Sequence, residues 1–121
     1  MKRNLFAALT MLFFTATAFS QAPESINYQA AVYDNDGNPV SNQSVSVRFA
    51  ILEGGPSGPV AYEEEHTGIL TTNQGLFNIR IGEGTNTGIG SAPDFGSINW
   101  GAANYFLRVE TDAGQGYEIL G

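Results

Sequence analysis

Apolar residues recur at every second position through most of the chain after residue 20. Four such sets stand out: Ile26, Tyr28, Ala30 and Val32; Val45, Val47, Phe49 and Ile51; Phe77, Ile79 and Ile81; and Tyr105, Leu107 and Val109. Because successive side chains of a strand point to opposite faces, each set predicts a strand with one apolar and one polar face. The intervening segments are rich in Gly, Pro, Asn and Asp, which favour turns. This pattern predicts an all-β fold, a single antiparallel β-sandwich over residues 21–121.

The first twenty residues follow a different pattern. A basic start precedes an apolar run over residues 5–18, and Ala18 and Ser20 are small residues suited to a signal peptidase. We expect residues 1–20 to be a signal helix that is cleaved, so that the mature chain begins at Gln21. A transmembrane anchor is the alternative, but threonines interrupt the apolar run, and no basic residues follow it that would stop its transfer through the membrane. The protein is therefore expected to be exported by the general secretory route, secreted or at the cell surface, with no membrane insertion after signal removal.

Charge and composition narrow the possible partners. The chain contains no cysteine, which excludes disulfides and lipid attachment at Gln21. Removing Lys2 and Arg3 leaves three arginines against twelve acidic residues, a formal charge of −9. Such a surface repels phosphate, so we expect no nucleic acid partner and no binding to an anionic membrane.

The three remaining arginines, Arg48, Arg80 and Arg108, are each expected in mid-strand on the face opposite the apolar set. Their expected cross-strand partners are Glu63, Glu65 and Glu110. An exposed pair of this kind contributes about 0.2–1 kcal/mol. The alternative is an arginine patch that binds an acidic ligand.

Residues 82–101 form the one long stretch without alternation. The glycines of residues 82–90 resemble a phosphate-binding loop, but no helix start follows at the right distance and Glu83 would repel an anion. We therefore expect a flexible loop there. Residues 91–100 carry Phe95, Ile98 and Trp100, and this segment is predicted to fold back and cap one end of the core.

Candidate catalytic and metal sites do not meet the requirements of their chemistry. Residues 63–66, Glu-Glu-Glu-His, contain possible metal ligands, but on a strand they alternate between two faces, so a solvated strand face is expected. Residues 34–38 resemble the start of a calcium loop, but the glycine comes early and no bidentate glutamate follows, so a hairpin turn is expected. His66 is the only imidazole, and no nucleophile lies in a Gly-x-Ser-x-Gly setting. We expect no catalytic residues, no metal, no cofactor and no enzymatic activity.

The aromatic residues leave a binding function open. Four of them are candidates for stacking on a sugar ring: Tyr33, Tyr62, Trp100 and Tyr105. Two coplanar, exposed rings among them would favour a carbohydrate-binding module with a glycan partner, whereas burial of all four would exclude it.

Several segments together resemble a known class of module. Residues 26–30, 48–52, 75–82, 98–101 and 105–109 are similar to the N-terminal β-module of secreted Bacteroidota-type surface proteins. Residues 31–40 and 45–47 also resemble the first hairpin of prealbumin-like or carboxypeptidase-regulatory-like modules, which implies a sandwich of Ig-like or prealbumin-like type.

The first resemblance implies an uncharacterised, non-catalytic structural or interaction module. In that family the module precedes a variable region, so the resemblance implies a downstream domain of the same polypeptide, or surface proteins, as partners. There the strand after Tyr117 continues further, and we therefore expect the last strand of this chain to be truncated at Gly121.

Overall fold

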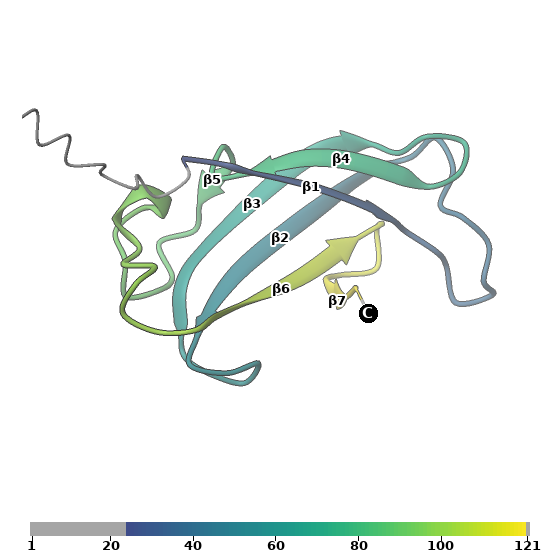
Figure 1. Ribbon diagram of the computed structural model, residues 1–121. Coiled ribbons are helices and arrows are strands. Elements are labelled where there is room, and N and C mark those ends of the chain that lie inside the picture. Colours follow the sequence, from purple (N-terminus) through teal and green to yellow (C-terminus); the bar gives the residue numbers. More distant parts are fainter. Residues whose placement is uncertain (1–23, 121) are drawn as a thin grey trace, which may run out of the picture.

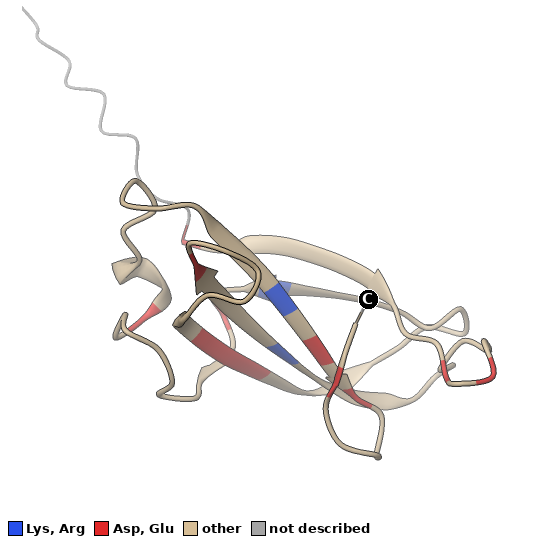
Figure 2. Ribbon diagram, turned by 90° about the horizontal axis from the view of Figure 1, so that it is seen from below, with Lys and Arg blue, Asp and Glu red and all other residues tan. Residues whose placement is uncertain are grey.

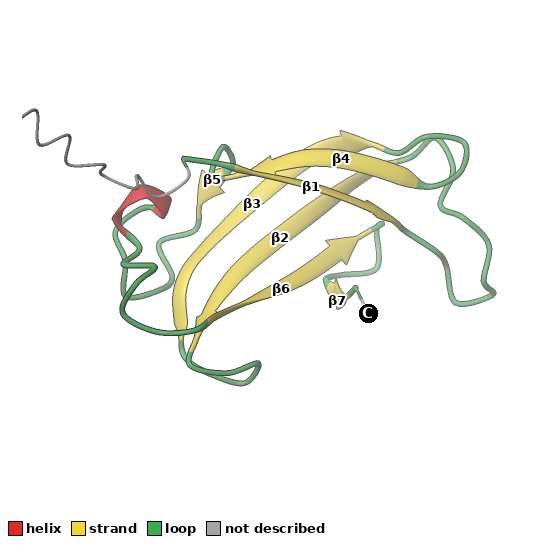
Figure 3. Cartoon of the chain, viewed as in Figure 1, coloured by secondary structure: helices red, strands yellow, loops and turns green. Residues whose placement is uncertain are grey.

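The computed structural model describes residues 24–120, so the expected signal helix and its cleavage site lie outside the described residues. The described chain is all-β, with two antiparallel sheets packed together, which confirms the predicted sandwich. Its strands are β1 (Ile26–Ala31), β2 (Ser44–Glu53), β3 (Val60–Leu70), β4 (Leu76–Ile81), β5 (Thr85–Asn86), β6 (Tyr105–Asp112) and β7 (Glu118–Ile119). Figure 3 shows one helical turn, η1 (Phe95–Ser97), between β5 and β6. No helix within residues 24–120 has the length and apolar character needed to cross a membrane.

The two sheets are unequal in size. The larger sheet has the order β5-β3-β2-β6-β7, with β2 at its centre. The smaller sheet consists of β1 and β4, paired antiparallel with Ile26 opposite Ile81. Figure 1 shows this two-stranded sheet lying across the long strands β2, β3 and β6. A two-stranded layer therefore has to cover a five-stranded one.

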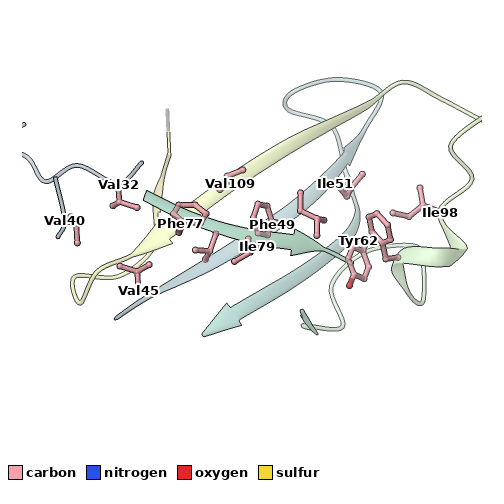
Figure 4. Packing of buried hydrophobic residues seen from close by; sticks show 13 residues of the cluster. Val32, Val40, Val45, Phe49, Ile51, Tyr62, Phe77, Ile79, Ile98 and Val109 are labelled. Atoms are coloured by element: carbon pink, nitrogen blue, oxygen red, sulfur yellow. The ribbon is translucent and has the colours of Figure 1, made fainter. Parts of the chain in front are cut away.

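The predicted apolar faces meet between the sheets (Figure 4). Phe49 of β2 and Ile81 of β4 are among the largest fully buried side chains. The ring of Tyr28 on β1 packs edge-to-face on Phe49, with ring centroids 5.2 Å apart. Phe95 and Ile98 are also buried in this core, which confirms that residues 91–100 fold back to cap one end.

One position on a predicted apolar face is not covered. Leu107 shares the inward face of β6 with Val109, which is buried, yet Leu107 is 41% exposed. Ile26 on β1, which lines the same groove as Leu107, is 38% exposed. The smaller sheet ends before it covers this part of the larger one, so an apolar surface remains open between β1 and β6.

The turn at residues 34–38 forms the expected hairpin. One carboxylate oxygen of Asp34 accepts hydrogen bonds from the N–H groups of Asp36 and Asn38, at 3.0 and 2.9 Å. An isolated antiparallel bridge between Tyr33 and Pro39 closes the turn. The strands on either side nevertheless belong to different sheets, because β1 pairs with β4 and not with β2.

Replacing Phe49 by alanine should lower the free energy of unfolding by about 3–5 kcal/mol, because the side chain is fully buried at the centre of the core. Urea unfolding of the wild-type protein and the variant measures this loss. Leu70→Ala is the control, since Leu70 is 69% exposed and its truncation should change stability by no more than about 0.5 kcal/mol. Equal effects of the two substitutions would show that the core is assigned wrongly.

Candidate functional site

The four aromatic residues proposed for stacking do not form a common surface. Tyr62 is buried, and its hydroxyl donates to Glu64, so it is not accessible to a ligand. Trp100 and Tyr105 pack edge-to-face with their ring planes 71° apart, which is not the coplanar arrangement that sugar stacking needs. Tyr33 is 60% exposed and lies apart from the other three, on the turn after β1.

Tyr33 borders a polar hollow of about 390 Å³. Other residues lining this hollow include Asp36, Gln43, Gln115 and Glu118. The lining therefore combines one aromatic ring with carboxylate and amide groups, which are able to bind hydroxyl groups of a polar ligand.

The expectation of a solvated strand face at residues 63–66 is wrong. Glu64 is 0% exposed and Glu63 is 4% exposed. The reason is that both faces of this part of β3 are covered: Gly82 and Gly84 bind the Glu64 carboxylate, and Thr87 and Arg108 contact the Glu63 carboxylate on the other face. A segment some twenty positions later in the sequence therefore covers what strand alternation alone leaves open.

The Glu64 carboxylate is enclosed by hydrogen-bond donors. Its Oε1 accepts from the Gly82 N–H at 2.6 Å and from the Tyr62 hydroxyl at 3.1 Å. Its Oε2 accepts from the Gly84 N–H at 3.0 Å and pairs with Nε2 of His66. Each carboxylate oxygen thus has two partners, all supplied by this chain.

These partners decide the protonation state of Glu64. Burial by itself raises the pKa of the Glu64 carboxyl, but the hydrogen bonds from His66, Gly82 and Tyr62 outweigh it and lower this pKa below its usual value. Burial, reinforced by the charge of Glu64, raises the pKa of Tyr62. Glu64 is therefore an ionised group whose acceptor sites are used inside the fold, which suits a structural role and not proton transfer.

Residues 82–90 are not the flexible loop that the sequence predicts. They include β5, and their first glycines donate N–H groups to a carboxylate. A Cβ at Gly84 would lie 2.6 Å from both Glu64 Oε2 and His66 Nε2, closer than real Cβ contacts allow. Gly82 and Gly84 bind an anionic group that the sequence pattern did not predict, the Glu64 carboxylate of the protein itself.

The arginines are occupied by ion pairs, largely as predicted. Arg48 donates to both carboxylate oxygens of Glu110, at 3.3 and 3.1 Å. Arg108 lies 3.6 Å from Glu63 and 3.4 Å from Glu110. These contacts confirm cross-strand pairing for two of the three arginines.

Arg80 departs from that prediction. Its Nε lies 3.7 Å from the carboxylate of Glu83, three residues along the chain, and its guanidinium also donates to the Ser25 hydroxyl. The reason is that β4 belongs to the smaller sheet, whose partner strand β1 carries no acidic residue.

An apolar groove of about 140 Å³ lies between β1 and the first half of β6. Its lining includes Ile26, Tyr28, Ile51, Ile81, Tyr105 and Leu107. No charged side chain lines it, and Phe106 and Leu107 of β6 are exposed beside it. In chemical terms, this surface is suited to apolar side chains and not to a charged substrate.

A family model described as "Domain of unknown function (DUF8740)" matches residues 27–121. The chain belongs to the DUF8740 family. The DUF8740 match begins one residue into β1 and covers the rest of both sheets, the hollow, and the groove except for Ile26. No curated protein and no solved structure matches the chain.

Replacing Glu64 by glutamine should lower the free energy of unfolding at neutral pH by about 1–3 kcal/mol, because an amide cannot accept hydrogen bonds on both of its terminal atoms. The pKa of Glu64 is lower in the folded state than in the unfolded state, so its carboxylate stabilises the fold above the unfolded-state pKa. That contribution is lost as the pH falls through the folded-state pKa. The difference in unfolding free energy between wild type and variant should therefore shrink in acid.

Urea unfolding at neutral pH and in steps down to about pH 3 measures this difference. Glu118→Gln on β7 is the matched control, because Glu118 is exposed and should show little difference at any pH. A wild-type to Glu64→Gln difference that stays constant across the series would contradict the assignment of an ionised, stabilising Glu64.

Proposed function

We propose that this chain is a non-catalytic β-sandwich module of a secreted or cell-surface protein, acting there as a structural, interaction or presentation domain. The observation that carries the proposal is the apolar groove beside β6, an exposed surface suited to a macromolecular partner. Its partners are a downstream domain of the same polypeptide or other surface proteins.

The chemistry of the buried acidic groups supports a non-catalytic role. A general acid or base needs a pKa near the working pH and access to its substrate. Glu64 has neither, since it is fully buried and its pKa is lowered. The arginines Arg48 and Arg108 are held in ion pairs across β2, β3 and β6, where they stabilise the sheet.

The placement of the chain ends supports a spacing or presenting role. The start of β1 and the end of β7 lie well apart on the sandwich (Figures 1 and 2). A module with separated ends holds the segments that are attached to its two ends apart from each other.

Export is tested by expressing the full chain in a bacterial host. The released or surface-bound protein should begin at Gln21 in N-terminal mass analysis, and antibodies raised against it should label intact cells or the medium. A soluble cytoplasmic product that retains Met1 would contradict the proposal.

A second candidate function is binding of a glycan at the polar hollow, favoured by the exposure of Tyr33 beside Asp36, Gln43 and Gln115. On a glycan array, binding by this route should be lost in Tyr33→Ala. Phe106→Ala is the control, since Phe106 is also an exposed aromatic residue but does not line the hollow. Binding that survives Tyr33→Ala, or no binding at all, would exclude this candidate.

A further inference from the structure

The polar hollow lies between two turns of the chain. One wall comes from residues 32–43, after β1, and the other from residues 111–118, where β6 turns into β7. One carboxylate oxygen of Asp112 accepts hydrogen bonds from two backbone N–H groups of the second turn, at 2.7 and 3.0 Å, as Asp34 does in the first. Both walls are therefore shaped by hydrogen bonds within this chain.

The described chain leads away from the hollow at both of its ends. Glu24 precedes β1, whereas the hollow begins where β1 ends. After β7, the Leu120 N–H donates to the Val109 carbonyl, so the chain there runs along β6 in the direction away from the hollow. The opening of the hollow is therefore not on the path that the chain takes at either end of residues 24–120.

The hollow contains a buried hydroxyl group without a partner. Thr111 lies on the inward face of β6 with Val109, is 8% exposed and lines the hollow. Within residues 24–120, its hydroxyl makes no hydrogen bond, whereas the other buried threonine, Thr71, donates to the Val40 carbonyl at 2.6 Å. Thr111 therefore offers both a donor and an acceptor to a molecule in the hollow.

The charged side chains around the hollow are all acidic. Asp34, Asp36 and Glu118 line it, and no basic side chain among residues 24–120 does. None of the three carboxylates has an ion-pair partner in the described part of the chain. A cationic group is therefore attracted to this site, whereas an anionic group is repelled.

Neutral polar groups and one aromatic ring complete the lining. The ring of Tyr33 is 60% exposed, and the amides of Asn35, Gln43 and Gln115 also line the hollow. An exposed ring packs against the apolar face of a sugar, and amides bind its hydroxyl groups. The volume of about 390 Å³ lies in the usual range of small-molecule sites, about 300–1,000 Å³. A simple cation would leave the ring and the amides unused.

We propose that the hollow binds a sugar that carries a protonated amino group. The carboxylates of Asp36 and Glu118 attract the ammonium group, Tyr33 stacks on the sugar ring, and Thr111 and the amides bind the hydroxyl groups. The inference rests on the glycan-binding candidate proposed above and specifies the class of sugar. Amino sugars are preferred to neutral and acidic sugars, because only an amino sugar places a positive charge among the unpaired carboxylates.

The probe is the tetramer of glucosamine, compared with the tetramer of N-acetylglucosamine, in which acetyl groups remove the positive charges. Each is titrated into the exported protein at about pH 6, where amino groups are protonated. Calorimetry should show saturable binding of the glucosamine tetramer that is at least about tenfold tighter than binding of the acetylated one. Equal affinity would overturn the proposal and leave binding of a neutral glycan standing.

The matched variants separate the hollow from the overall negative charge. Asp36→Asn removes one carboxylate from the hollow and should weaken binding at least about tenfold. Glu24→Gln is the control, because Glu24 is exposed and lies outside the hollow, and its replacement removes the same charge. Equal weakening by the two substitutions would overturn the proposal in favour of general attraction between the protein and a cation.

Backbone amide signals of the wild-type protein in nuclear magnetic resonance give a readout that does not depend on any variant folding. The glucosamine tetramer should shift the signals of Tyr33, Thr111 and Gln115 in a saturable manner. Putrescine, a diamine without a sugar ring, should bind at least about tenfold more weakly. Equal binding of putrescine would overturn the proposal in favour of a site for simple cations.

Absence of saturable binding by both tetramers would overturn the proposal together with the glycan-binding candidate. The proposed role as a secreted or cell-surface module would then still stand or fall by the export experiment, which does not involve the hollow.

Discussion

The Glu64 carboxylate, on a strand of the larger sheet, binds the turn by which the chain leaves the smaller sheet. It lies on β3 and accepts hydrogen bonds from Gly82 and Gly84, in the turn that follows β4. A buried charge with a missing partner costs several kcal/mol, whereas one with every lone pair engaged is tolerated. The turn is consequently bound to β3, and the segment after it, which contains β5 and the capping Phe95, starts from a defined position.

That segment closes one end of the sandwich, but the side between β1 and β6 stays open. A two-stranded sheet cannot cover all of a five-stranded one, so the inward-facing Leu107 remains exposed while its neighbour Val109 is buried. Proteins commonly protect such edges with charges, bulges or a covering segment. Here Arg108, the charged residue in this stretch, is engaged by Glu63 and Glu110. The uncovered apolar surface is thus a consequence of the unequal sheets.

The charge distribution separates paired charges on the larger sheet from unpaired acidic residues elsewhere. Figure 2 shows basic segments on strands, whereas acidic segments also occupy turns and loops. The cross-strand pairs of Arg48 and Arg108 stabilise the outer face of the larger sheet. The unpaired acids elsewhere give the domain its negative charge, which acts on the approach of a partner and not on the stability of the core.

The alternation of apolar residues determined the strands, their inward faces and the fold class, because side-chain direction along a strand follows from local backbone geometry. Local composition predicted two further features: the turn at Asp34, from its turn-forming residues, and the cap formed by Phe95 and Ile98, from their apolar side chains. Only the tertiary structure decided that β1 pairs with β4, that Glu64 is buried against the turn at Gly82 and Gly84, and that Leu107 is exposed. Alternation states which residues share a face, but what covers that face depends on segments distant in sequence, whose position is set by packing and by buried hydrogen bonds.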